Sequence, residues 1–547
     1  MNKTNDQSYK FNSNHDIGSL DAESDKFLQE AFIQKSDYDI LLDTNNSRCI
    51  LCGRTGAGKS ALISRLEHNE NNLTRIIPES MSLKYLSNST ILNYFQKLNI
   101  KLDLFYKVLW KHVFIVELLK LKYGNDIDKS KSILNRLISN FKQKDKKKES
   151  AIEYLSNWQD EFWEKTEYRI KEIEMGLQKK FVQKLGLKGK LFESFFETGF
   201  ENEDIEKESK NIEVIHKAQN VVNDIQIDEI FNILSLLREE IFIDDQKKFF
   251  IVIDDLDKEW VDKKIVYDIL KGLIEAIKEL KSLKGVKIII ALRENLLKKI
   301  FEDNSSRGVQ REKYSNLYLN ITWTDDELEQ LLYNRINKLF SNQNSTNISS
   351  VHDILPKEKK QEKSGFHYIL ERTFLRPRDV IDFFNKCIKH AHGKIKINRE
   401  TLHNAEYEYS NERLKAIEDE WLENYSNVKT LYSFLIGIKN GFKINDILEK
   451  ADDYFFEKIC TNSIEVEDTH LASIIDKYNK DTDIEHFLKS ILLVLYEIGI
   501  ICIKPTPEDQ HKHCCKDSIT FDLTNLDENV KIYIHPTFIK ALQIKAR

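Results

Sequence analysis

The sequence has little proline and no apolar stretch of membrane length. Only six prolines occur in 547 residues, which favours a protein built of long helices. The longest apolar run, residues 492–503, contains Glu497 and is too short to span a bilayer, so it predicts a buried helix and strand. Residues 1–16 are polar and lack the apolar segment of a signal peptide. These absences argue against a membrane-spanning or exported protein.

Cysteine content and net charge set two further limits. The seven cysteines are scattered or lie beside apolar residues, which is typical of a reducing compartment. The formal net charge of −6 provides no overall attraction to nucleic acids or membranes. We therefore expect a cytoplasmic protein, and its length predicts two or three domains.

The sequence does contain a phosphate-binding loop. The segment from Gly53 to Ser60 reads GRTGAGKS and matches G-x-x-x-x-G-K-[ST] between a short apolar strand and a helix. Glycines let backbone amides approach phosphate oxygens, and the helix N-terminus attracts anions. Lys59 is expected to bind the β- and γ-phosphates, and Ser60 to coordinate Mg²⁺. The predicted nucleotide-binding residues here are Gly53, Arg54, Thr55, Gly56, Ala57, Gly58, Lys59, Ser60 and Ala61.

A second buried strand supplies the acidic groups of such a site. Residues 247–253 are mostly apolar and are followed by Asp254 and Asp255. Asp254 is predicted to hold Mg²⁺ through water, and Asp255 to orient or deprotonate the attacking water. A buried strand that merely ends in surface aspartates is the alternative. Residues 286–293 predict another parallel strand, with Arg293 at the carboxyl edge where ligands bind in open α/β sheets.

The predicted nucleotide is ATP. Guanine-specific proteins carry Asp-x-x-Gly after the Mg²⁺ strand, and residues 254–257 lack that glycine. Arg307 and Arg311 lie in a later loop, where they would either face a neighbouring subunit's γ-phosphate in a homo-oligomer or be ordinary surface residues.

Two more arginines, Arg376 and Arg378, lie where a lid would cover the nucleotide. They would either reach its phosphates or form salt bridges with Asp379 or Glu371, and the sequence favours neither alternative. Pro377 between them suits the first turn of a helix.

Five segments are predicted from the changing pattern along the chain. They are a disordered N-terminus at 1–18, a P-loop ATPase core at 19–81 and 246–323, a helical insertion with long antiparallel helices at 82–245, a helical lid at 324–404 and a winged-helix-like domain at 405–547. The core is expected to be a three-layer α/β/α fold with a parallel sheet, and residues 19–46 to begin it as a helix. Strands are expected at 500–504, 518–523 and 531–534 in the last domain.

Two features of that last domain raise other functions. Its candidate recognition helix, residues 483–498, has Lys489 as its only strong base, so packing or regulation is favoured over DNA reading. A cluster of potential zinc ligands follows. Its members are His511, His513, Cys514 and Cys515. Adjacent cysteines do not form a Cys-x-x-Cys pair, and no second pair accompanies them, so metal binding is disfavoured.

The chain resembles a little-characterised group of bacterial P-loop ATPases that is similar to the KAP and STAND branches of the AAA-type superfamily. The resemblance is carried by the P-loop and by residues 253–257, 291–293, 321–323 and 534–538. It implies an ATPase core with a helical lid and winged helix, and members are associated with signalling and anti-phage conflict. Asp255 stands where AAA proteins usually carry Glu, which implies slow turnover, and Arg376-Pro377 replaces the usual Gly-x-Pro turn.

The leading hypothesis is an ATP-driven conformational switch that hydrolyses ATP and uses Mg²⁺. One alternative is a DNA-associated ATPase that uses its winged helix. The other is a scaffold in which ATP is structural and the helical insertion binds a protein effector.

Overall fold

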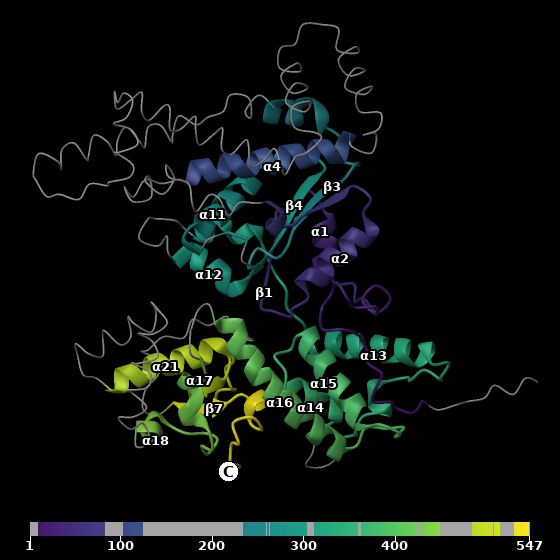
Figure 1. Ribbon diagram of the computed structural model, residues 1–547, viewed down its shortest axis with the longest axis vertical. Helices are drawn as coiled ribbons and strands as arrows, with labels where there is room; N and C mark the ends of the chain where they lie inside the picture. Colours follow the sequence, from purple (N-terminus) through teal and green to yellow (C-terminus); the bar gives the residue numbers. More distant parts are fainter. Residues whose placement is uncertain are drawn as a thin grey trace, which may run out of the picture. The chain divides into compact units, whose positions relative to one another are not determined.

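The computed structural model describes residues 9–81, 102–123, 233–258, 260–261, 263–302, 311–358, 363–422, 425, 428–448, 484–506, 508–514 and 530–545. The chain divides into two compact units, whose elements are shown in Figure 1. The sheet unit comprises Gln34–Arg54 and Lys59–Ile321, and the helical unit comprises Met1–Ile33, Thr55–Gly58 and Thr322–Arg547. Within the described part of the chain, every helix is too short or too polar to cross a membrane.

The sheet unit is built on five parallel strands, and the prediction of an α/β core with a parallel sheet is confirmed. The strands are β1 (Ile50–Gly53), β2 (Leu73–Ile76), β3 (Phe249–Ile253), β4 (Val286–Arg293) and β5 (Tyr318–Asn320), in the spatial order β2-β3-β4-β1-β5. The chain leaves β1 towards the β2 edge and leaves β4 towards the β5 edge.

Helices pack on both faces of this sheet. On one face, α4 (Asp103–Tyr123) and α11 (Lys263–Leu280) share an apolar cluster with Ile251 and Ile253 of β3. Phe250 and Val252 alternate with them and are fully buried on the opposite side of the strand. There α2 (Lys59–Asn69) packs against β1 and β2, and α1 (Ser36–Leu42) precedes β1 (Figure 1). The unit also contains α12 (Glu294–Glu302) and the short turns η1 (Pro78–Met81), η4 (Leu237–Ile241) and η6 (Arg311–Leu317).

The aromatic segment ending at Trp110 packs on the core of the sheet unit. Trp110 is buried and donates a hydrogen bond from Nε1 to the main-chain oxygen of Ile269 in α11 (3.0 Å). Gly272 of α11 lies so close to α4 that an added Cβ would come within 2.7 Å of the Tyr106 Cβ atom. This helix therefore belongs to the sheet unit's core, although the sequence placed it in the helical insertion. Of the insertion with long antiparallel helices predicted at 82–245, residues 82–101 and 124–232 lie outside the described residues.

Two predictions for the N-terminal region are wrong. Residues 9–18 were expected to be disordered, yet Tyr9, Phe11 and Ile17 are buried in the helical unit, and the Tyr9 ring stacks on Phe340 at 4.2 Å. Residues 19–46 were expected to form one helix, but only α1 is helical there. The apolar spacing that suggested a helix reflects the burial of Leu28 and Ala31 in turns. Residues 1–8 lie outside the description.

The helical unit begins with a bundle around one apolar cluster. Its helices are α13 (Asp325–Asn342), α14 (Gly365–Glu371), α15 (Pro377–His390) and α16 (Arg399–Trp421), with η7 (Val351–Asp353) between the first two. A capping box starts α13, with Glu327 N donating to Thr324 Oγ1 and Thr324 N to Glu327 Oε2. Pro377 opens α15 as expected. Since α16 runs through residues 404 and 405, the predicted boundary between lid and last domain falls inside one helix.

The remaining elements form a second apolar cluster in the same unit. They are α17 (Val428–Tyr432), η8 (Ser433–Leu435), α18 (Ile444–Leu448), α21 (Ile484–Ile498), β6 (Ile501–Lys504), β7 (Lys531–Ile534) and η10 (Pro536–Phe538). Strands β6 and β7 pair antiparallel, whereas the strand predicted at 518–523 lies outside the described residues. A helix followed by a hairpin is compatible with a winged helix, which stays a prediction.

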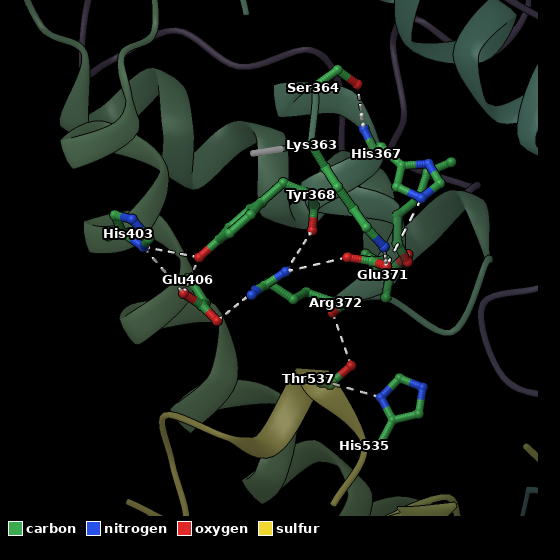
Figure 2. A network of polar contacts seen from close by, with 12 residues as sticks. Lys363, Ser364, His367, Tyr368, Glu371, Arg372, His403, Glu406, His535 and Thr537 are labelled. Carbon is green, nitrogen blue, oxygen red and sulfur yellow. Dashed lines mark hydrogen bonds and ion pairs between the residues drawn. The ribbon is translucent and has the colours of Figure 1, made fainter. Parts of the chain in front are cut away.

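A polar network joins this part to the bundle (Figure 2). Glu406 of α16 accepts hydrogen bonds from Arg372 Nε (2.6 Å) and the Tyr368 hydroxyl (2.5 Å), and Thr537 Oγ1 donates to the Arg372 main-chain oxygen (2.8 Å). Glu406 is buried, so these donors provide the compensation that a buried carboxylate requires. The segment after β7 is thereby tied to α14 and α16.

Candidate functional site

The phosphate-binding loop connects the end of β1 to the first residue of α2. Gly56 and Gly58 have φ angles of +81° and +101°, which side chains with a Cβ adopt only under strain. A Cβ added at Gly56 would also lie 2.8 Å from Arg378 Cβ. The glycines that the motif requires are therefore demanded by backbone conformation and by space.

Lys59 is the first residue of α2. Its ammonium donates hydrogen bonds to the main-chain oxygens of Gly53 (2.9 Å) and Arg54 (3.1 Å). Ser60 and Ala61 follow in the first turn, and all three are half-buried. A cation thus lies where a helix begins, and a helix N-terminus also attracts anions.

Asp254 and Asp255 directly follow β3 at the same edge of the sheet. One strand, β4, separates β3 from β1, which corresponds to a lateral spacing of about 10 Å between the two strands. Asp254 is buried, and its Oδ1 accepts a hydrogen bond from Asp255 N (2.9 Å). Asp255 is more exposed, has φ +60° and pairs with Lys258 Nζ (2.9 Å). The left-handed conformation of Asp255 interrupts the extended backbone, so its side chain and that of Asp254 do not follow the alternation between opposite faces of the sheet that is usual in a strand.

Arg75 of β2 is part of this acidic site, although the sequence did not point to it. Its Nη2 lies 3.8 Å from Asp254 Oδ2 and 3.7 Å from Asp255 Oδ2, and its Nη1 lies 3.7 Å from Glu67 Oε2. Burial raises the pKa of Glu67, with a smaller contribution from Asp254, while Arg75 opposes the increase. The available signal was a basic residue near the carboxyl end of a short strand.

Of Arg293, Arg307 and Arg311, which were predicted for the nucleotide site, only Arg293 has a described side chain. Arg293 ends β4 directly beside Gly53 in the strand register, so it does emerge at the carboxyl edge, where it forms an ion pair with Asp257. Arg311 begins η6, but its side chain lies outside the description. Arg307 also lies outside the described residues.

The tip of the loop, Thr55–Gly58, is held by the helical unit, to which it belongs. Arg376 Nη1 donates to the Thr55 main-chain oxygen (2.6 Å), and Trp323 Nε1 donates to the Ala57 main-chain oxygen (2.8 Å). The stem of Arg378 lies against Gly56. Three side chains near the beginnings of α13 and α15 therefore fix successive peptides of the loop.

Arg376 forms the salt bridge with Asp379 that the sequence left open. Arg376 Nε lies 2.9 Å from Asp379 Oδ2, and Arg413 Nη2 lies 2.8 Å from Glu420 Oε2 in the same buried group. Burial by itself would raise the pKa of Asp379, but Arg376 and Arg413 outweigh it and the pKa is lowered. Glu371 pairs instead with Lys363. Arg378 donates from Nε to the Leu20 main-chain oxygen (3.2 Å).

The chain is similar to a described family and to known proteins. Residues 326–418 match the profile of a family described as the FunZ-associated C-terminal helical domain. The transposon gamma-delta 80.3 kDa protein of Escherichia coli strain K12 is 24% identical over 548 residues, which cover 96% of this chain and 67% of that protein. A Walker-type ATPase of Pyrococcus abyssi has a solved structure that is 12% identical, with a TM-score of 0.37 over 94% of this chain and 96% of that chain. The family match spans α13 to α16 and concerns the helical unit alone.

Proposed function

We propose that this chain binds ATP with Mg²⁺ at the loop of residues 53–60 and hydrolyses it slowly. The supporting observation is that the Lys59 ammonium, which follows β1, and the carboxylates after β3 belong to one edge of the sheet, with the left-handed glycines of the motif directly before Lys59 in the chain. The acidic side also suits a metal ion. Asp254 Oδ2 is buried without a hydrogen-bond partner in the described part of the chain, and Arg75 is 3.8 Å away. A hydrated dication would satisfy this oxygen.

Each residue then has a defined task. Bound Mg²⁺ would supply charge neutralisation to the transferred phosphoryl group. Lys59 would exchange its two carbonyl partners for phosphate oxygens, and Ser60 and Asp254 would hold the ion. Asp255 would orient or deprotonate the attacking water, a task for which it must leave Lys258. That competing ion pair agrees with slow turnover.

We further propose that hydrolysis drives a conformational switch of the STAND or KAP type. Arg376 and Trp323 bind main-chain oxygens of the loop tip, so a change in the tip on nucleotide binding would be transmitted to α13 and α15. A role in signalling or anti-phage defence comes only from the family resemblance. The same applies to a homo-oligomer that places Arg307 and Arg311 at a neighbour's site.

The test is to measure ATP binding and phosphate release in Lys59→Ala and Asp255→Asn. Lys59→Ala should lose ATP binding because it removes the cation beside the phosphates. Asp255→Asn should keep binding and lose most turnover. Lys247→Ala, which removes an exposed lysine before β3, is the control and should behave as wild type. Unchanged ATP affinity in Lys59→Ala would refute the site, and tight binding without turnover in the wild type would favour a scaffold.

A DNA-associated ATPase is the second candidate, because the Escherichia coli relative is named as a transposon protein. The predicted recognition helix gives this candidate little support. Lys489 of α21 pairs with Glu485 (2.7 Å), and most of the apolar residues of the helix are buried. ATPase activity stimulated by duplex DNA, with steeply salt-dependent binding, would favour this function. A rate indifferent to DNA would count against it.

A further inference from the structure

The segment after β6 folds back along that strand and aligns potential metal ligands. Ile503 N donates to the Lys512 main-chain oxygen (3.1 Å), and Lys512 N donates to the Ile503 main-chain oxygen (2.8 Å). In this antiparallel register Cys502 lies opposite His513. Because side chains alternate along extended chains, His511 and His513 lie on the same face as Cys502.

The ligand atoms are close enough for one ion. The Cys502 Sγ and one ring nitrogen each of His511 and His513 all lie within 4.8 Å of one another. With Zn–S of about 2.3 Å and Zn–N of about 2.0 Å, tetrahedral ligands are about 3.5 Å apart. Small rotations of two exposed or half-buried imidazoles would close the difference.

Neighbouring rings orient the two histidines. The His511 ring lies 4.4 Å from that of Tyr533, which faces Cys502 from β7, and the His513 ring lies 5.0 Å from that of His535. His535 is itself fixed, because its Nδ1 accepts a hydrogen bond from Thr537 N (3.2 Å; Figure 2). His511 is exposed, so it is not a histidine retained for core packing.

We propose that Cys502, His511 and His513 form a Zn²⁺ site whose fourth ligand is water. One thiolate and two imidazoles are soft and borderline ligands that favour Zn²⁺ over Mg²⁺. Cys502 is nine residues before His511, so it is not part of a Cys-x-x-Cys motif. It approaches the two histidines only because residues 511–513 fold back along β6. Burial raises the pKa of Cys502 to about 12, so an ion must displace a firmly held proton. The bound ion would join residues 511–513 to β6.

The test uses untagged full-length protein titrated with Zn²⁺ alone and, separately, with Co²⁺ as a spectroscopic probe. Wild type should bind one Zn²⁺ per chain and show a thiolate-to-cobalt absorption band. His511→Gln and His513→Gln should weaken Zn²⁺ binding by at least about 10-fold, the lower limit for loss of an outer-shell partner. Cys502→Ser should lose the thiolate band. Lys59→Ala should bind Zn²⁺ as wild type does, which separates this site from the nucleotide site.

The matched control is His68→Gln, which removes an exposed histidine of α2. It should leave Zn²⁺ affinity unchanged. His511→Gln alters an exposed side chain, so it keeps the test valid if the buried Cys502→Ser variant misfolds. Substoichiometric binding, or the same affinity in His511→Gln, His513→Gln and His68→Gln, would overturn the proposal.

Discussion

Arg376 donates a hydrogen bond from Nη1 to the main-chain oxygen of Thr55, over 2.6 Å. The same guanidinium forms an ion pair with Asp379, which is almost completely buried. A residue of the phosphate-binding loop is therefore bound to a charge network of α15 and α16. In the switch proposed above, this hydrogen bond would transmit a change in the loop to α15.

Asp379→Asn should destabilise the helical unit by about 3 kcal/mol, because the buried Arg376 loses its closest carboxylate and, of the described carboxylates, only Glu420 is left to pair with Arg376 and Arg413. The measurement is the midpoint of urea unfolding at neutral pH. Asp382→Asn is the control on the same helix. Burial raises the pKa of Asp382 despite Lys386, so its neutral replacement should cost much less. Equal losses in the two variants would contradict the role given to Asp379.

The same carboxylate predicts a pH dependence of stability. The pKa of Asp379 is lower in the folded state, so its contribution is fully present above the unfolded value of about 3.9 and is lost as the pH falls through the folded pKa. Wild type should lose stability in acid more steeply than Asp379→Asn does. If the unfolding free energies of the two proteins had the same pH dependence, the lowered pKa of Asp379 would be contradicted.

Gly56→Ala should weaken ATP binding and destabilise the protein. Its φ of +81° costs an alanine about 1 kcal/mol, and the Cβ would additionally lie 2.8 Å from Arg378 Cβ. Gly393→Ala isolates the first effect, because Gly393 has φ +76° and nothing within 4 Å of an added Cβ. Thermal denaturation should therefore show a larger loss at Gly56. Equal losses of thermal stability in the two variants would mean that the Arg378 side chain can move away from the added Cβ without destabilising the protein.

Arg75→Gln should lower the Mg²⁺ concentration needed for half-maximal phosphate release by roughly fivefold. It removes a cation that competes with the metal for Asp254 and Asp255, worth about 1 kcal/mol at these distances. Arg48→Gln, just before β1 and hence near the amino ends of the strands, should have no effect. A higher Mg²⁺ requirement in Arg75→Gln would show that Arg75 positions the carboxylates instead.

Lys287 of β4 should make wild-type stability rise between about pH 8 and pH 10.5. It donates hydrogen bonds to the main-chain oxygens of Ile40 (2.5 Å) and Asp43 (2.7 Å) at the end of α1. Burial lowers its pKa to about 8, so the folded state releases the proton first and deprotonation favours folding. The difference in unfolding free energy between wild type and Lys287→Met should therefore change over this range. A difference in unfolding free energy that stays constant over this pH range would contradict the lowered pKa of Lys287.

The strands and the loop were predictable because their determinants are local. An apolar run such as Phe249–Ile253 can be buried on both sides only in a covered parallel sheet, and it forms β3 as expected. A glycine-rich loop of this sequence between a strand and a helix is typical of a phosphate-binding loop. Asp254 and Asp255 were recognisable because they directly follow the apolar run of β3. The burial of Tyr9 and Phe11 was missed because their partners, such as Phe340, are distant in sequence.

The amino-acid sequence by itself determined the buried strands, the phosphate loop and the acidic pair that follows β3, since each depends on neighbours within a few residues. Only the tertiary structure decided that Arg75 faces those acids, that Arg376 binds Thr55 as well as Asp379, and that Cys502 meets His511 and His513. These contacts join residues whose separation in the chain carries no periodic signal. Burial and charge pairing select them only after the chain has folded.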